Sequence, residues 1–171
     1  MQQNSVWRAP GMPALLGMVL AGFSGYALLM PIAPLWAVRG GTDEAGAGLV
    51  TGVFMLFTVL SQLFVPAALR RFGWTRVLVV GMLLLGLPAA AHLLSEDLPL
   101  ILFLAAVRGA GFAVLTVCGS GAVAELVEPA RRGRAIGAFG LGIAGPQVLL
   151  LPAAPWIAEQ LGFWLVFLLA T

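Results

Sequence analysis

The sequence is dominated by long runs of apolar residues that are separated by short polar segments. A helix of roughly 20 apolar residues crosses the about 30 Å hydrocarbon core of a bilayer, and these runs are of that length. The hydrocarbon core contains no water to hydrogen-bond the backbone N–H and C=O groups. Such runs must therefore form helices, in which these groups bond to one another. The sequence therefore predicts an all-α integral membrane protein. The expected spans are 12–38, 45–69, 77–94, 99–127 and 135–158, with the start of a sixth at 163.

Composition excludes several classes of protein. Hydrophobic residues make up 61% of the chain and charged residues 9%, whereas a soluble domain carries about 25% charged residues. The net charge of +2 comes from arginines at the ends of the apolar runs, which does not indicate nucleic-acid binding. Cys118 is the single cysteine, so no intrachain disulfide can form. The spans hold no cluster of catalytic or metal-ligating side chains, and we expect neither an enzyme, a cofactor nor a metal.

The distribution of arginines predicts the topology. Cytoplasmic loops carry the excess of basic residues in membrane proteins. Only Arg39 falls on the opposite side of the membrane from the other arginines that flank the spans. We therefore expect the N-terminus to be cytoplasmic and the loop at Asp43 to be external. As localisation, we expect a bacterial cytoplasmic (inner) membrane. The arginines on the predicted cytoplasmic side are Arg8, Arg70, Arg71, Arg76, Arg131, Arg132 and Arg134.

Arg108 carries a fixed charge inside the apolar run 99–127. It lies roughly 13 Å from the start of that run, at about 1.5 Å per helical residue. A charge at such depth costs roughly 2.5–3.5 kcal/mol on insertion scales, and usually faces a water-filled cavity or a partner inside the bundle. The alternative is an arginine that packs against helix-end carbonyls and only fixes the bundle. Gly109 and Gly111 beside it would let a neighbouring helix approach closely.

Other polar residues of the spans are weaker candidates. Tyr26 and Gln62 could line a cavity or hydrogen-bond across helices, and the sequence leaves both alternatives open. His92 lies near the end of the run 77–94, where we expect interfacial packing or solvent exposure.

Three short motifs lie within or after the second and fourth spans. They are Arg71, Phe72, Gly73 and Arg76; the arginine and glycines at 108–111; and Glu125 followed by Arg132 and Gly133. Together they resemble motifs of the major facilitator superfamily. The first is similar to the family's signature loop after the second span, although Arg70 replaces the aspartate of that loop. The arginine and glycines at 108–111 resemble the arginine–glycine motif of its fourth helix. Glu125 followed by Arg132 and Gly133 matches the loop after that helix. In the fifth span, Gly145 and Pro146 match the Gly-Pro pair of the family's antiporter signature, but leucines stand where that signature has two glycines.

This resemblance implies a fold and partners. The chain 1–171 would be the N-terminal half of such a transporter, a bundle of two inverted three-helix repeats with an incomplete sixth helix. Spans one and four would line a cavity, with the site near the membrane midplane, and complete members have about twelve spans. The implied partners are the lipid bilayer, a small-molecule substrate and a missing C-terminal half.

The resemblance also implies a function. It predicts a secondary active transporter that moves a small organic solute by alternating access, in the direction of efflux. The alternative is a non-transporting membrane fragment or scaffold that needs a partner half. Substrate binding or coupling is expected at Arg108, Tyr26, Gln62 and Gln147; the cytoplasmic gate at Arg70, Arg71, Gly73, Arg76, Glu125 and Arg132; and helix packing at Gly109, Gly111, Gly145 and Pro146.

Overall fold

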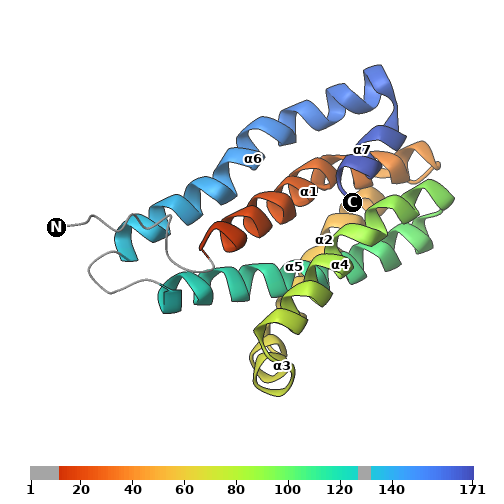
Figure 1. Ribbon diagram of the computed structural model, residues 1–171. Coiled ribbons are helices and arrows are strands. Elements are labelled where there is room, and N and C mark those ends of the chain that lie inside the picture. The colour runs from red at the N-terminus through yellow and green to blue at the C-terminus, as the bar shows by residue number, and fades with distance from the viewer. Residues whose placement is uncertain (1–11, 127–131) are drawn as a thin grey trace.

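The computed structural model describes the backbone of residues 12–126 and 132–171, and the side chains of 13–121 and 133–171. No strand occurs in these ranges, and short connections join the helices (Figure 1). The elements are α1 (Met12–Arg39), α2 (Glu44–Gln62), α3 (Val65–Phe72), α4 (Trp74–Ala91), the short 3₁₀ helix η2 (His92–Leu94), α5 (Leu98–Leu126), α6 (Arg132–Leu161) and α7 (Phe163–Leu169).

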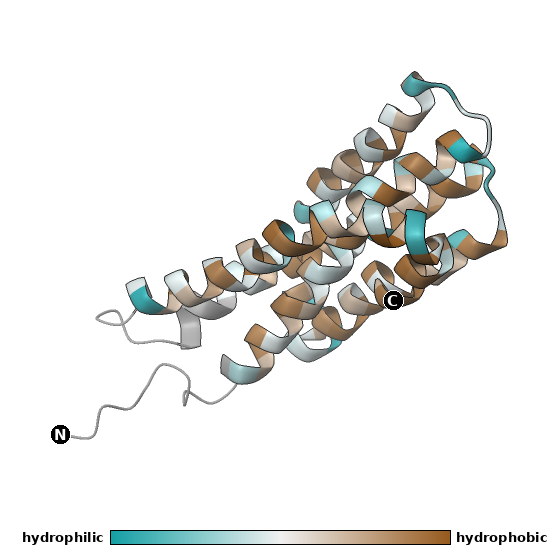
Figure 2. Ribbon diagram, turned by 90° about the horizontal axis from the view of Figure 1, so that it is seen from above, coloured by the Kyte–Doolittle hydropathy of each residue, from teal (hydrophilic) through white to brown (hydrophobic). Residues whose placement is uncertain are grey.

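Five of the described helices, α1, α2, α4, α5 and α6, are long and apolar enough to cross a membrane. Apolar residues run along these helices, while the most hydrophilic ones gather mainly at helix ends and in connections (Figure 2). The prediction of an all-α membrane protein is therefore confirmed. The helix α7 covers the start of the sixth apolar run, as expected.

The second apolar run differs from the prediction because it is not one helix. The helix α2 ends at Gln62, and α3 begins at Val65 after a turn. Pro66 explains the break, since proline has no N–H for the carbonyl four residues earlier, but fits the first turn of a new helix. The helix α6 continues through Pro146, Pro152 and Pro155, which membrane helices tolerate because neighbours satisfy the freed carbonyls. It is longer than the predicted 135–158.

Two helices occupy the centre of the bundle. The most apolar window of α1 is 61% buried and that of α5 is 50% buried, against 22% for α2 and 17% for α6. The helix α1 packs mainly on α6, whereas α5 packs mainly on α2 and α4. Figure 1 shows α6 along one side of α1 and the α2, α4 and α5 group along the other. Each central helix therefore packs against the second span of the other three-helix repeat: α1 against α6, and α5 against α2. This exchange fits two inverted three-helix repeats.

Candidate functional site

The described residues form a partly open pocket between α1, α2 and α5. Its empty space is about 370 Å³, including the part that is open to solvent. Most of its wall is aliphatic or aromatic, which is typical of sites for small organic molecules. Its wall includes Tyr26, Met30, Phe54, Met55, His92 and Arg108.

Arg108 enters this pocket from α5 and is only 4% exposed. Its Nε donates to the carbonyl of Leu85 on α4 at 3.1 Å, and its Nη2 donates to the carbonyl of Gly25 on α1 at 3.2 Å. Its guanidinium carbon lies 5.9 Å from the ring centroid of Phe54 on α2. The side chain therefore joins α5 to α1, α2 and α4. The two carbonyls lie within α1 and α4 rather than at the helix ends that the packing alternative expected.

The ties to carbonyls leave part of the guanidinium unused. Among the described residues, Arg108 has no carboxylate partner, and its Nη1 makes no hydrogen bond. A guanidinium carries five N–H donors in a planar fork, and Nη1 holds two of them. The arrangement can fix the bundle and still offer a charged hydrogen-bond donor to a further group. A structural role and a binding role are therefore compatible at this residue.

Two glycines bring the neighbouring helices close to Arg108. A Cβ added at Gly109 would collide with the backbone carbonyl of Phe54 on α2. One added at Gly111 would lie 2.5 Å from the backbone nitrogen of Leu85 on α4. Backbone atoms on both sides thus leave no room for a side chain, which is the close approach that small residues permit in membranes.

Tyr26 faces the same pocket from α1 and is 8% exposed. Its ring stacks on Phe112 with centroids 4.4 Å apart, and its hydroxyl donates to the sulfur of Met30 at 3.0 Å. The ring of Phe54 lies 5.7 Å away. The structure therefore brings Tyr26 and Arg108, two of the predicted site residues, into one pocket with an aromatic wall.

The two glutamines predicted for the site lie outside this pocket. Gln62 donates to the hydroxyl of Thr116 at 3.2 Å, which joins α2 to α5. The side chain of Gln147 donates to the carbonyl of Ile143 at 3.2 Å, within its own helix α6. Neither residue lines the pocket that holds Arg108. For Gln62, the structure favours the alternative of a hydrogen bond across helices.

His92 is a pocket residue that the sequence analysis did not predict for the site. It is fully buried, so solvent exposure, one of the two expected alternatives, is wrong, whereas interfacial packing is not contradicted. Its Nδ1 lies 2.9 Å from the carbonyl of Pro88, and its ring stacks on Phe167 of α7 at 5.2 Å between centroids. Its Nε2 is buried and has no hydrogen-bond partner among the described residues. A lone histidine close to the end of an apolar run gives no signal of this position.

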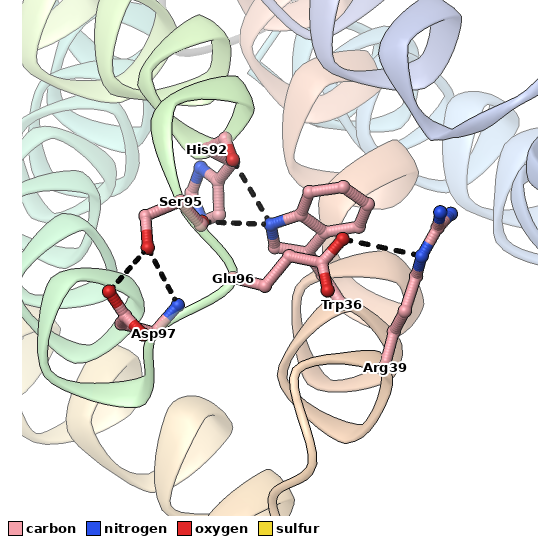
Figure 3. A network of polar contacts seen from close by, with 6 residues as sticks. All are labelled: Trp36, Arg39, His92, Ser95, Glu96 and Asp97. Atoms are coloured by element: carbon pink, nitrogen blue, oxygen red, sulfur yellow. Dashed lines mark hydrogen bonds and ion pairs between the residues drawn. The ribbon is translucent and has the colours of Figure 1, made fainter.

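A polar network holds the segment around His92 against α1 (Figure 3). The indole Nε1 of Trp36 donates to the carbonyls of His92 and Ser95, at 3.0 and 3.1 Å. Arg39 pairs with Glu96 at 3.3 Å, the one ion pair between described residues. These contacts join the end of α1 to the connection between α4 and α5, and turn the histidine inward rather than toward solvent.

The predicted gate residues are described only in part. The arginines Arg70, Arg71 and Arg76 are exposed around the junction of α3 and α4. Gly73 forms this junction with a φ of 80°, which glycine adopts readily. The side chains of Glu125 and Arg132 lie outside the described ones. Their expected pairing stays a prediction.

The predicted packing pair in α6 is corrected in one position. Pro146 is buried. A Cβ at Gly145, however, would meet nothing within 4 Å. Gly145 is therefore not a close-packing position among the described residues, because α6 meets the bundle mainly through α1 and leaves this part of its surface uncovered.

Comparison with known proteins identifies the family to which this architecture belongs. The family described as Major Facilitator Superfamily matches residues 14–171. A protein of Candida albicans named MFS antiporter QDR3 is 27% identical over 146 residues, which are 85% of this chain and 21% of that protein. The chain thus spans about a fifth of the relative's length. Since the family match covers nearly all of the described helices, this integral membrane protein belongs to the major facilitator superfamily.

Proposed function

We propose that this chain forms the N-terminal half of a secondary active transporter that moves a small organic solute by alternating access. The observation that carries the proposal is Arg108, a buried guanidinium with free donors in a pocket walled by Tyr26 and Phe54. Charges buried in membrane spans mark substrate or ion pathways in most cases. Family membership and the relative's name, an antiporter, support the same reading.

Efflux is the direction that we propose, with Arg108 as the group that holds a polar or anionic part of the solute or a carboxylate of the other half. The planar fork of an arginine suits either partner. The rival proposal is a non-transporting scaffold. Sequencing the reading frame beyond Thr171 separates them first, since a second set of six apolar runs would supply the other half of a transporter.

Transport itself is tested in vesicles that contain the complete protein. Labelled small organic solutes would be offered with and without a pH gradient, and uptake compared with protein-free vesicles. Flux that depends on the protein and saturates with solute would support a transporter. Absence of flux across a broad panel, with the protein correctly folded and inserted, would favour the scaffold.

A cysteine-labelling experiment tests the proposed topology. In a Cys118→Ala background, Arg71→Cys is expected to react with an impermeant maleimide only after the membrane is permeabilised, because its turn is cytoplasmic. Glu44→Cys should react from outside in intact cells. Glu44 is preferable to Asp43, whose carboxylate caps α2 by accepting from the Gly46 N–H at 2.9 Å. Rapid labelling at 71 but not at 44 would overturn the orientation. The bacterial inner membrane stays a prediction, since the named relative is fungal.

The proposed cytoplasmic gate is tested at Glu125. We expect this carboxylate to pair with Arg132 or with an arginine of the 70–76 turn, at a strength of about 0–1 kcal/mol, as for exposed ion pairs. Glu125→Gln should shift the transporter toward the inward-open state, with little effect on thermal stability. Labelling of single cysteines placed on the two sides of the cavity would report the shift. Unchanged labelling on both sides would count against the gate.

A further inference from the structure

Two polar groups in the pocket wall have hydrogen-bonding capacity that no described residue uses. Arg108 is a cation with no anion beside it among the described residues. His92 has a ring nitrogen, Nε2, with no hydrogen-bond partner there. Buried polar atoms are almost always hydrogen-bonded, so an exception calls for an explanation. Both residues belong to the wall of the same pocket.

The hydrogen bonds of the two side chains define what each one still offers. The Nδ1 of His92 faces the carbonyl of Pro88 at 2.9 Å. A carbonyl only accepts, so Nδ1 carries the hydrogen, and the Nε2 of a neutral ring is left as an acceptor. Nη1 of Arg108 is a charged donor without a described partner. Arg108 therefore offers a charged donor at Nη1, and His92 offers an acceptor at Nε2. An anionic group suits the first, and a hydrogen-bond donor suits the second.

The remaining wall constrains the rest of the ligand. Phe54 and Tyr26 contribute aromatic rings, and Met30 and Met55 contribute thioethers. The rings of Tyr26 and Phe54 are 5.7 Å apart between centroids and tilted by 32°. Such a wall accepts a flat apolar group, because aromatic rings and methionine sulfur both pack favourably against a further ring.

We propose that the pocket binds an organic acid that carries a hydroxyl next to its carboxylate and an aromatic or other apolar group. Nη1 of Arg108 holds the carboxylate, Nε2 of His92 accepts the hydroxyl hydrogen, and the apolar group packs against Phe54 and Tyr26. The proposal rests on the proposed function, since it names the solute class of the same site. His92 thereby becomes a specificity-determining residue.

Mandelate and phenylacetate test this proposal, because they differ only by the hydroxyl. Equilibrium binding of each labelled acid to the full chain in lipid nanodiscs would be measured at about pH 8, where a histidine is ordinarily neutral. We expect mandelate to bind about tenfold more tightly, the worth of one buried hydrogen bond. The corresponding diol, which lacks the carboxylate, should bind at least about tenfold more weakly than mandelate because a charge-assisted bond is lost.

Variants at position 92 assign the preference to its nitrogen. His92→Phe keeps a ring to stack on Phe167 but has no acceptor, so the two acids should bind with nearly equal affinity, close to that of phenylacetate in the wild type. His92→Gln places an amide oxygen near Nε2 and should restore part of the preference. Ser120→Ala is the matched control, since this exposed hydroxyl bonds only within α5. It should change neither affinity.

Each outcome decides for or against the proposed solute class. Equal binding of the two acids to the wild-type chain would overturn it, as would a full preference that persists in His92→Phe. Binding of neither acid would also overturn it. The transport proposal would survive these results if the vesicles carry another solute. Selective binding without any flux would leave the pocket assignment standing and defeat transport instead.

Discussion

Replacing Arg108 with methionine is expected to abolish transport and to leave the bundle nearly as stable as the wild type. Methionine fills a similar volume but has no charge to desolvate. Exchange of a buried charge for a well-packed apolar side chain is often neutral or stabilising, so the free energy of unfolding should change by no more than about 1 kcal/mol. The hydrogen bonds to Leu85 and Gly25 would be lost, and no donor would remain for a solute.

Two further substitutions separate the roles of charge and geometry. Arg108→Lys keeps the charge, but one ammonium group cannot reach Leu85, Gly25 and a ligand with the geometry of a planar fork. We expect initial rates of transport to fall at least about 100-fold, as for truncation of a buried charged contact. Arg108→Ala should also abolish transport, with some loss of stability from the cavity that it leaves. Both proteins should still insert and remain monodisperse in detergent.

The measurements are initial rates of transport in vesicles and thermal unfolding in detergent, made on the same preparations. A stable and fully active Arg108→Lys protein would defeat the assignment of a substrate clamp. A methionine variant that loses most of its stability would show that the ties to α1 and α4 are the main role of this arginine.

Gly111→Ala is expected to be strongly destabilising. Its Cβ would lie 2.5 Å from the nitrogen of Leu85 and 2.6 Å from the carbonyl oxygen of Gly81, both in the backbone of α4. Overpacking costs about 1–3 kcal/mol where side chains can yield, and occasionally more. Here the two helices must separate, so we expect a loss of about 3 kcal/mol or more. The same separation would break the bond between Arg108 and Leu85, and transport should fall with stability.

Gly52→Ala in α2 is the matched control for this experiment. Its Cβ would meet nothing within 4 Å, so only the helix preference of alanine remains, worth about 0.5–1 kcal/mol in favour of the variant. Thermal unfolding and the monodisperse fraction after extraction would be compared for both proteins. A Gly111→Ala protein with the melting temperature of the wild type would show that the crossing of α4 and α5 adapts more easily than its backbone contacts indicate.

The sequence by itself determined the class of the protein and its most important charge. In lipid, a run of about 20 apolar residues can make its backbone hydrogen bonds internally only as a helix. The all-α membrane fold therefore followed from length and composition. Arg108 stood out for the same reason, because a charge in hydrocarbon is expensive wherever its neighbours lie. Glycines beside it indicated a close helix crossing. The break before α3 was not predicted, and Pro66 accounts for it only once the structure is known.

Only the tertiary structure decided which of the polar residues share a pocket. His92 joins Arg108 because Trp36 on α1 holds its segment inward and Phe167 on α7 covers its ring. These contacts link positions that are far apart in the sequence. Gln62 likewise donates a hydrogen bond to Thr116, a distant residue in the sequence, and does not line the pocket. Helical spacing tells which residues share a face, but helices that are apolar on nearly every side give no signal of which neighbour covers that face.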